Sequence, residues 1–278
     1  MKTSTQLKAL LRNLSKNSNV KAEILLRNFM LERFLERVSI SEYRNNFILK
    51  GGMLIAAMVG IDTRSTMDID ASIKGQKLAT EEISTICTNI LGVQIDDGVE
   101  LNLRGIEEIR EEADYPGYRV SIDARLDKTR QTLKVDISTG DYVTPKEVEY
   151  RFKLMFENRE IRILAYNLET VLAEKMETII TRGITNTRMR DFYDIYILTN
   201  TQPYDSGTFR AALHKTAEKR KTTEQVSDAT GTIQMIADSE IMTNLWRRYQ
   251  TRYTYAADIS WDMVITAVKI LVKKALEE

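Results

Sequence analysis

Two aspartates inside a segment of alternating apolar and polar residues constrain the fold more than any other feature. Apolar residues occupy every second position from Met67 to Ile73, and Asp68 and Asp70 lie between them. This period of two predicts a β-strand, in which residues two apart project from the same face. Aspartate is a poor strand former and adjacent like charges repel, so a divalent cation between the carboxylates is the usual compensation. The alternative is a solvated edge strand with a polar outer face.

A pair of glycines precedes this segment. The apolar run 47–49 is typical of a short buried strand, which ends at Gly51 and Gly52, and residues 53–59 then have the spacing of a helix ended by Gly60. Adjacent glycines between a strand and a helix allow backbone N–H groups to approach a phosphate at the helix N-terminus. An ordinary strand–helix turn is the alternative interpretation.

A third carboxylate lies on another predicted strand. Segments 120–126 and 133–137 both alternate, and together they predict a hairpin. The apolar neighbours of Asp136 face a core, so Asp136 projects from the opposite face. Three carboxylates on neighbouring strands near a glycine turn are the parts of a two-metal phosphoryl-transfer site.

Asp123 is an alternative third ligand. Arg119 and Arg125 share its strand face, because all three residues are separated by even numbers of positions. We expect these arginines to neutralise Asp123, and we therefore predict Asp136 as the third metal ligand.

A predicted helix from Asn167 to Arg182 carries a lysine on its apolar side. Asn167 is a suitable N-cap and Gly183 a suitable stop, and Lys175 falls inside the stripe of apolar residues. The functional interpretation directs its ammonium group to nucleotide phosphates. The alternative is that the lysine snorkels to solvent.

Two further aspartates follow on a second predicted helix. Asp191 and Asp194 are three positions apart, so they lie on the same side of that helix. Their position after Lys175 indicates that they belong to the same site. The alternative is a pair of carboxylates bridged to Arg188 and Arg190.

The charge balance gives no global indication of nucleic-acid binding. The 278 residues contain 40 Lys and Arg and 40 Asp and Glu, but a binding face needs only local charge. Basic clusters at 219–221 and 247–248 would guide an RNA acceptor, and solvated helix faces are the alternative. Four aromatic residues at helical spacing either stack on bases or pack in the core: Tyr193, Tyr196, Trp246 and Trp261.

Sulfur and imidazole ligands are nearly absent. One cysteine, Cys87, and one histidine, His214, exclude an internal disulfide, a Cys-rich metal site and a multi-His site. A metal would be oxygen-ligated, which favours Mg²⁺ or Mn²⁺. There is no signal-peptide apolar block, and no segment approaches the roughly 18 apolar residues that span a bilayer. We therefore expect a cytoplasmic protein with no membrane partner.

The order of elements indicates an α+β protein. Helical spacing covers about residues 4–40, strands and helices are mixed up to about 160, and helices follow. We predict two domains, a core with a helical lead-in at 1–160 and a helical domain at 161–278.

Five motifs taken together resemble those of the AbiEii/AbiGii toxins of abortive-infection systems, which are nucleotidyltransferases of the DNA polymerase β-like superfamily. The motifs are Leu-Lys-Gly-Gly at 49–52, Arg-Ser-Thr-Met-Asp-Ile-Asp at 64–70, Lys-Val-Asp at 134–136, Ala-Glu-Lys at 173–175 and Arg-Asp-Phe-Tyr-Asp at 190–194. They occur in the order found in that family, and the similarity extends from about residue 20 to 200. An Asp-x-Asp element alone is only moderately specific, whereas five elements in order are a strong indication.

The resemblance implies a bilobed protein with a polymerase β-like core and a helical C-terminal domain that completes the active-site cleft. It implies transfer of a nucleoside monophosphate from an NTP with release of pyrophosphate. Asp68 and Asp70 match the metal ligands of that family. Lys175 and Asp191 match the lysine and the acidic residue of the later motifs.

The expected nucleotide-binding residues surround the glycine turn and the second half of the site. They are Lys50, Gly51, Gly52, Arg64, Thr66, Lys175 and Asp194. Typical nucleotidyltransferases have Gly-Ser where this chain has Gly52 and Met53. The phosphate contact is therefore expected from backbone groups or from Thr66.

Related toxins modify the acceptor end of tRNA and block translation, and a co-encoded antitoxin restrains them. The resemblance thus implies an NTP, an RNA acceptor and a separate antitoxin as partners, and a role in phage defence. Two other interpretations stay open: transfer to a protein or small-molecule hydroxyl, and a non-catalytic nucleotide-binding module. The joint presence of Asp68, Asp70, Asp136 and Lys175 argues against the second of these.

Overall fold

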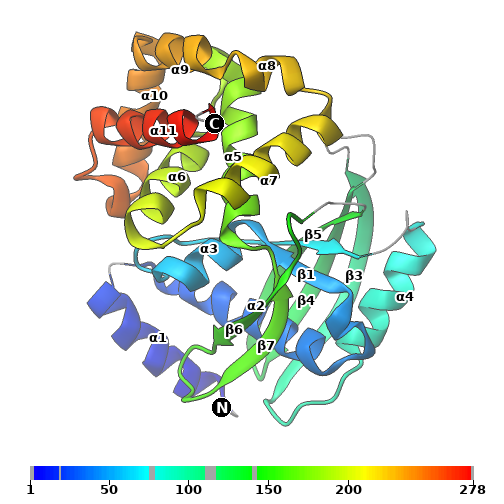
Figure 1. The fold of residues 1–278 in the computed structure, drawn as a ribbon. Coiled ribbons are helices and arrows are strands. Elements are labelled where there is room, and N and C mark those ends of the chain that lie inside the picture. The colour runs from blue at the N-terminus through cyan, green and yellow to red at the C-terminus, as the bar shows by residue number, and fades with distance from the viewer. Residues whose placement is uncertain (1–2, 19, 75–78, 110–116, 140–142, 277–278) are drawn as a thin grey trace. The chain divides into compact units, whose positions relative to one another are not determined.

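The structure, a computed structural model, describes residues 3–18, 20–74, 79–109, 117–139 and 143–276 (Figure 1). The chain divides into two compact units. The first, the sheet unit, comprises residues 1–141 and 147–165, and the second, the helical unit, comprises residues 142–146 and 166–278. The boundary expected after residue 160 falls inside a strand, Glu160–Ala165. That the two units are the two predicted domains stays a prediction.

A seven-stranded mixed sheet forms the centre of the sheet unit, in the order β3-β4-β5-β2-β1-β7-β6. The strands are β1 Phe47–Lys50, β2 Ile69–Ile73, β3 Val99–Ile109, β4 Gly117–Leu126, β5 Thr129–Thr139, β6 Val148–Lys153 and β7 Glu160–Ala165. The pairs β1–β7 and β2–β5 are parallel and the other pairs are antiparallel. The β4–β5 hairpin confirms the pairing predicted from the two alternating segments, and the mixed sheet confirms the α+β class.

In the part of the sheet unit that the structure describes, four α-helices accompany this sheet: α1 Ser4–Ser18, α2 Ala22–Ile40, α3 Gly51–Val59 and α4 Thr80–Leu91. The helical lead-in predicted over 4–40 is thus two helices. Helix α2 packs against β3, β5 and β7 and contacts α4, and it buries most of its surface. Helix α3 begins directly after β1 and ends at Gly60, whose φ of 95° is readily adopted only by glycine. Cys87 of α4 is buried, which raises the pKa of its thiol to about 12.

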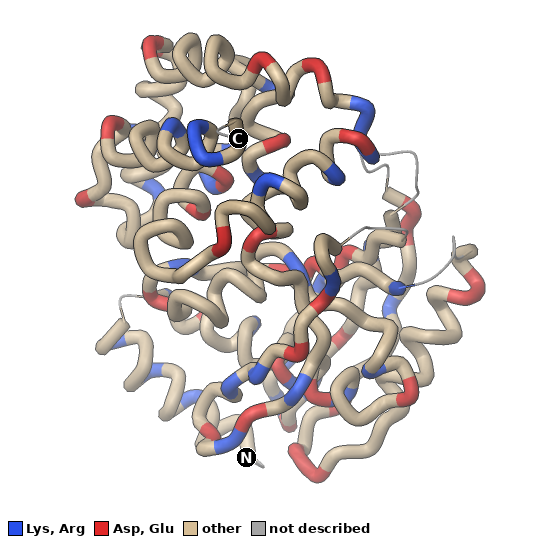
Figure 2. Tube along the Cα trace, in the orientation of Figure 1, with Lys and Arg blue, Asp and Glu red and all other residues tan. Residues whose placement is uncertain are grey.

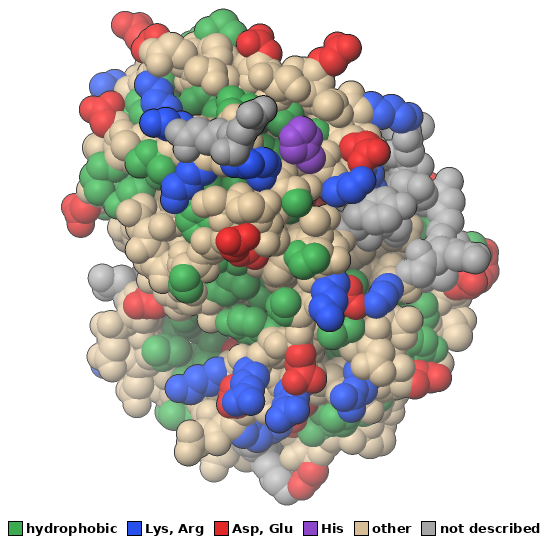
Figure 3. All heavy atoms as spheres, viewed as in Figure 1, with side chains coloured by type: hydrophobic (Ala, Val, Ile, Leu, Met, Phe, Trp, Pro, Cys, Tyr) green, Lys and Arg blue, Asp and Glu red, His purple; other side chains and the backbone are tan. Residues whose placement is uncertain are grey.

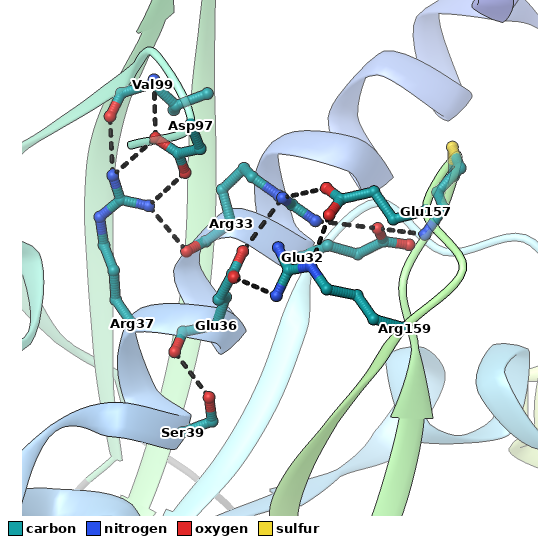
Figure 4. Close-up of polar contacts among 10 residues, drawn as sticks. Glu32, Arg33, Glu36, Arg37, Ser39, Asp97, Val99, Glu157 and Arg159 are labelled. Carbon is teal, nitrogen blue, oxygen red and sulfur yellow. Dashed lines mark hydrogen bonds and ion pairs between the residues drawn. The ribbon is translucent and has the colours of Figure 1, made fainter. Parts of the chain in front are cut away.

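A network of buried charges ties α2 to the strands around it (Figure 4). Arg37 donates to both carboxylate oxygens of Asp97, at 2.9 and 3.2 Å, and to the carbonyl oxygen of Val99 at 2.7 Å. Arg33 binds Glu157 of the β6–β7 connection at 2.6 Å and Glu36 at 3.0 Å. Because an unpaired buried charge is costly, these contacts fix the position of α2 on the sheet.

Glu32 is the member of this network whose pKa is strongly raised by burial. Its carboxylate accepts a hydrogen bond from the backbone N–H of Met155 at 2.7 Å, yet burial raises its pKa to about 8. Glu32 is therefore protonated at neutral pH. The remaining charges then balance, with three arginines opposite three carboxylates: Arg33, Arg37 and Arg159, and Glu36, Asp97 and Glu157.

The helical unit consists of seven α-helices among the residues described. They are α5 Leu168–Arg182, α6 Met189–Thr201, α7 Ser206–Arg220, α8 Thr223–Ser227, α9 Ala229–Ala237, α10 Glu240–Arg252 and α11 Trp261–Leu276. Helix α5 packs against α6 and α7, and α11 packs against α6, α7 and α9. Asn167 accepts the N–H of Thr170 at 2.8 Å, and Gly183 with φ 51° follows the last residue of α5. Both ends of α5 are as predicted.

Within the described part of the chain, no helix is long and apolar enough to cross a membrane.

Candidate functional site

Two of the three predicted metal ligands are direct neighbours in the sheet. Asp70 is the second residue of β2 and lies opposite Asp136 of the parallel strand β5. Neighbouring strands are about 4.8 Å apart, so these two carboxylates emerge side by side. Asp68 directly precedes β2, which begins at Ile69. All three carboxylates are half-buried.

The glycine turn is shaped around Asp70. The N–H of Gly52 donates to Oδ2 of Asp70 at 3.3 Å. Gly51 has φ 65°, and a Cβ atom at this position would lie 2.1 Å from the same oxygen. A Cβ on Gly52 would lie 2.7 Å from Oγ1 of Thr66. The two glycines therefore allow β2 and the 64–68 segment to approach the start of α3, a role that the sequence did not reveal.

The segment before Asp68 is hydrogen-bonded to helix α2. Asn28 donates through Nδ2 to the carbonyl oxygen of Thr66 at 2.9 Å, and Oγ1 of Thr66 donates to the carbonyl oxygen of Asp68 at 3.2 Å. Arg64 is buried and donates to the carbonyl oxygen of Ser65. These contacts position Asp68 relative to β2, and the nucleotide contacts expected of Arg64 and Thr66 stay predictions.

Arg119 is paired with Asp136 and not with Asp123. Its Nε and one terminal nitrogen donate to the two oxygens of Asp136 at 2.8 and 2.7 Å. Asp123 instead accepts from Thr132 at 3.0 Å and lies 3.7 Å from Arg104. The expectation that Arg119 neutralises Asp123 was wrong because four residues of a strand span about 13 Å, whereas a cross-strand neighbour is adjacent. Asp123 is equally remote from Asp70, since Asp136 is the residue level with Asp70.

Asp68 lies among both negative and positive side chains, and these charges affect its pKa. Burial and the neighbouring charge of Asp136 raise the pKa of Asp68, and this rise is opposed by Arg27, Lys134 and Arg119. A divalent cation between oxygen ligands would relieve the same repulsion.

The donor set fits Mg²⁺ or Mn²⁺ in part. Asp68 and Asp70 supply suitable oxygens, but both oxygens of Asp136 are engaged by Arg119. Across the described ranges, no group of three or more Asp, Glu, His or Cys side chains forms a ready-made metal cluster. Asp136 would have to share its carboxylate between the guanidinium and a metal.

The residues predicted from the later motifs meet in the helical unit. The ammonium group of Lys175 lies between Oδ1 of Asp191, at 2.8 Å, and Oδ2 of Asp194, at 2.7 Å. Burial opposes the charged form of Lys175, but the two carboxylates outweigh it and raise its pKa. Arg188 adds a contact to Oδ2 of Asp191 at 2.9 Å. The lysine therefore does not snorkel, and the aspartates hold it in place.

The basic and aromatic residues weighed for RNA binding divide into structural and exposed groups. Arg220 binds Glu177 and Glu174, a structural role that neither interpretation foresaw, whereas Arg247 and Arg248 are exposed. Tyr193, Trp246 and Trp261 are buried core residues, while Tyr196 is half-buried. Positive and negative side chains are interspersed along the chain and on the face shown in Figures 2 and 3.

Several functional candidates had no sequence signal of their own. Arg119 contacts Asp136 across two strands, and Asn28 contacts the Asp68 segment over 38 positions. The contact of Arg188 with Asp191, in contrast, was part of the alternative interpretation of the acidic pair, because their spacing places both residues on one helix face.

One family model matches most of this chain. A family model described as "Nucleotidyl transferase AbiEii toxin, Type IV TA system" matches residues 33–267. None of the curated proteins matches this chain significantly.

Two solved structures resemble this chain in fold although their sequence identity to it is low. MenT4, a nucleotidyltransferase toxin from Mycobacterium tuberculosis H37Rv, is similar over 96% of this chain and 99% of its own, at 13% identity and a TM-score of 0.58. JHP933 from Helicobacter pylori is similar over 92% of this chain and 93% of its own, at 15% identity and a TM-score of 0.54. Because the family model spans most of the sequence, this chain belongs to the AbiEii family of nucleotidyl transferase toxins of type IV toxin–antitoxin systems.

Proposed function

We propose that this protein transfers a nucleoside monophosphate from an NTP to an RNA acceptor, with Mg²⁺ or Mn²⁺ as cofactor. The observation that carries the proposal is the alignment of Asp70 with Asp136 on adjacent strands, with Asp68 beside them and the Gly51–Gly52 turn against Asp70. Clustered carboxylates of this kind repel one another and are suited to a cation and a triphosphate.

In the reaction, an acceptor hydroxyl attacks the α-phosphorus, and the bond from this phosphorus to the pyrophosphate oxygen breaks as the new ester bond forms. Asp68 and Asp70, with Asp136, would hold the divalent cation, which neutralises charge on the phosphates when bound. Backbone N–H groups at the start of α3 and the side chains of Lys50, Arg64 and Thr66 would orient the triphosphate.

Lys175 supplies a fixed positive charge to the same reaction. Its raised pKa keeps it protonated at neutral pH, and Asp191 and Asp194 hold the ammonium group in one position. Positioning and charge neutralisation then account for catalysis, with no covalent enzyme intermediate.

The acceptor we propose is the 3′ end of tRNA, so that the modification blocks translation during abortive infection. The family's membership of type IV toxin–antitoxin systems supports a separately encoded antitoxin as partner. We further propose that the protein acts in the cytoplasm, in defence against phage.

The test is incubation of the purified protein with each α-labelled NTP, Mg²⁺ and total tRNA. An Asp68→Ala/Asp70→Ala variant removes the proposed metal ligands, and Asp123→Asn is the matched control, since Asp123 is an exposed aspartate of the same sheet. Label that enters RNA with the wild type and Asp123→Asn, but not with the double variant, supports the proposal.

Label in protein or in a small molecule would replace RNA as the acceptor. NTP binding without any transfer would favour a non-catalytic nucleotide-binding module.

A further inference from the structure

The helical unit contains stacked tyrosines that the proposed reaction does not use. Tyr253 and Tyr255, which follow α10, stack with ring centroids 5.3 Å apart and an interplanar angle of 27°. Both rings are half-buried, so part of each remains accessible, whereas Tyr193, Tyr249 and Trp246 behind them are buried. Accessible aromatic surface is therefore present on this loop, whereas only Tyr196 of the four aromatic residues singled out in the sequence is half-buried in the same way.

Two arginines lie on Tyr253. The guanidinium carbon of Arg190 is 5.5 Å from the ring centroid, and a terminal nitrogen donates to the tyrosine hydroxyl at 3.0 Å. The guanidinium carbon of Arg252 is 5.4 Å from the same centroid. Cation–π contacts of this kind hold planar guanidinium groups beside the aromatic rings. We call Arg190, Arg252, Tyr253 and Tyr255 the arginine–tyrosine cluster.

The cluster is fixed to the helix that carries two of the predicted site residues. Tyr255 contacts Tyr193 of α6, with ring centroids 4.8 Å apart, and its hydroxyl is 3.0 Å from that of Tyr249. Arg190 directly precedes Asp191 on α6, and Asp191 binds Lys175. The cluster and the lysine site therefore share one rigid support in the helical unit.

The local charge at this place is positive, although the whole chain is neutral. Two stretches without any Asp or Glu, 183–190 and 241–257, meet where α6 and α10 pack together. They contain five arginines, of which Arg188 is paired with Asp191, and the other four are Arg190, Arg247, Arg248 and Arg252. An anionic ligand is favoured here, and planar groups beside the charges favour bases over acidic side chains.

We propose that the arginine–tyrosine cluster binds a single-stranded segment of RNA, with unpaired bases stacking on the planar groups and phosphates paired with the arginines. Stacking needs bases that are not already paired, so the ligand is a single-stranded end or loop and not an RNA duplex. The inference rests on the proposed function only in taking this RNA to be the acceptor.

The experiment measures binding of a fluorescent single-stranded RNA of roughly ten nucleotides, a length within the site size of single-strand binding proteins. Fluorescence anisotropy is recorded with the 278-residue chain, without NTP or metal. The variants are Tyr253→Leu, which keeps apolar volume, Arg252→Gln, and Arg252→Lys, which keeps charge but loses the plane.

Tyr204→Leu is the matched control, because Tyr204 makes the same type of contact elsewhere in the helical unit. The ammonium group of Lys274 lies 4.9 Å from its ring centroid. This control tests whether loss of any tyrosine–cation pair affects RNA binding.

Tyr253→Leu is expected to weaken RNA binding about 10-fold or more, since the stacking surface for one base is lost. Arg252→Gln should lower the affinity and reduce the slope of log K against log salt by about 0.7, as one phosphate contact is lost. Arg252→Lys should retain the slope and lose part of the affinity. Tyr204→Leu should bind as the wild type does.

Equal affinity of wild type, Tyr253→Leu and Arg252→Gln would overturn the inference, as would a wild type that does not bind RNA. Displacement of the RNA by an acidic peptide or by duplex RNA at equal concentration would also overturn it, because charge alone would then explain binding. Thermal melting of each variant verifies folding, and Arg252→Gln, an exposed substitution, serves if Tyr253→Leu does not fold.

RNA binding and NTP-dependent labelling, measured on the same variants, distinguish loss of the cluster's role from loss of the transferase function. Weaker RNA binding by the cluster variants, combined with no NTP-dependent labelling by the wild type, would leave the cluster intact and remove the transferase function. Full-rate RNA labelling by Tyr253→Leu with unchanged affinity would remove the cluster and leave the function.

Discussion

The two groups of predicted site residues differ in how their charges are arranged. In the sheet unit, Asp68 and Asp136 are half-buried carboxylates, and burial together with the neighbouring charge of Asp136 raises the pKa of Asp68. In the helical unit, Lys175 is enclosed by two carboxylates that raise its pKa and hold it. The first group would gain stability from an added cation, whereas the carboxylates of the second are already paired with the ammonium group of Lys175. Substitution of a carboxylate in the first group should therefore lower activity without lowering stability, whereas substitution of Lys175 should lower both.

The largest effect on nucleotide transfer is expected from Asp70→Asn. Loss of a metal ligand should reduce nucleotide transfer by about 10³-fold, because several kcal/mol of charge stabilisation in the transition state is removed. The free energy of unfolding should stay the same or increase, because one repelling charge is removed. Transfer assays and urea denaturation measure the two quantities, and a strongly destabilised Asp70→Asn would break the comparison.

Lys175→Met should act on stability as well as on activity. The substitution keeps the length of the side chain but removes the ammonium group from between the buried Asp191 and Asp194, while Arg188 still contacts Asp191. Removal of one partner from a buried ion pair costs about 3–5 kcal/mol of unfolding free energy. Urea denaturation gives the value, with Lys215→Met as an exposed control, since the side chain of Lys215 is 62% exposed. A loss of activity with unchanged stability would mean that the aspartates are not held by this lysine alone.

Glu32 gives an intermediate case, a buried carboxyl group whose charge is suppressed. Its pKa of about 8 in the folded protein exceeds the ordinary value of 4.5, so the folded state retains a proton that the unfolded state loses above pH 4.5. Stability is therefore lost as pH rises from 4.5 to 8. Glu32→Gln should remove this dependence and stabilise the protein by roughly 3 kcal/mol at pH 7.5.

Chemical denaturation at pH 5 and pH 7.5 measures this effect. Glu23→Gln, an exposed substitution on the same helix, is the control, because the side chain of Glu23 is 72% exposed. Equal pH dependence of Glu32→Gln and the wild type would contradict the raised pKa.

The smallest effect is expected from Arg119→Gln, which sharpens the assignment of Asp136. The Arg119–Asp136 pair is partly exposed, so its loss should cost less than about 1 kcal/mol of stability. If Asp136 is a metal ligand, removal of the competing guanidinium should lower the Mn²⁺ concentration that half-saturates the protein. This concentration is measured by titration with Mn²⁺, in which the electron paramagnetic resonance signal of the free ion is followed. Arg125→Gln is the control, and an unchanged Mn²⁺ affinity of Arg119→Gln would exclude Asp136 as a ligand.

Local patterns carried most of what the sequence could predict. The alternation around Asp68 and Asp70 and the cap residues Asn167 and Gly183 act through neighbours in the chain, so their roles are readable from spacing. The residues of α5 and α6 could be grouped because the later motifs have an order known from the AbiEii family. The fold class followed from the order of strands and helices.

The contacts that were not predicted depend on register or on distant segments. Arg119 is opposite Asp136 because the β4–β5 hairpin turns at residues 127–128, where Asp127 has a φ of 52°. A turn displaced by one residue would have paired different side chains. The fit of Gly51 against Asp70, 19 positions later, likewise arises only when β1 and β2 pair.

Cys87, buried on α4 with a thiol pKa of about 12, has a practical consequence for spectroscopy. Maleimide reagents react with the thiolate, which this side chain does not form near neutral pH. A cysteine introduced at an exposed position such as Asp123 would then be the single reactive thiol of the folded protein. Fluorophores and spin labels can therefore be attached at chosen places without first removing the native cysteine.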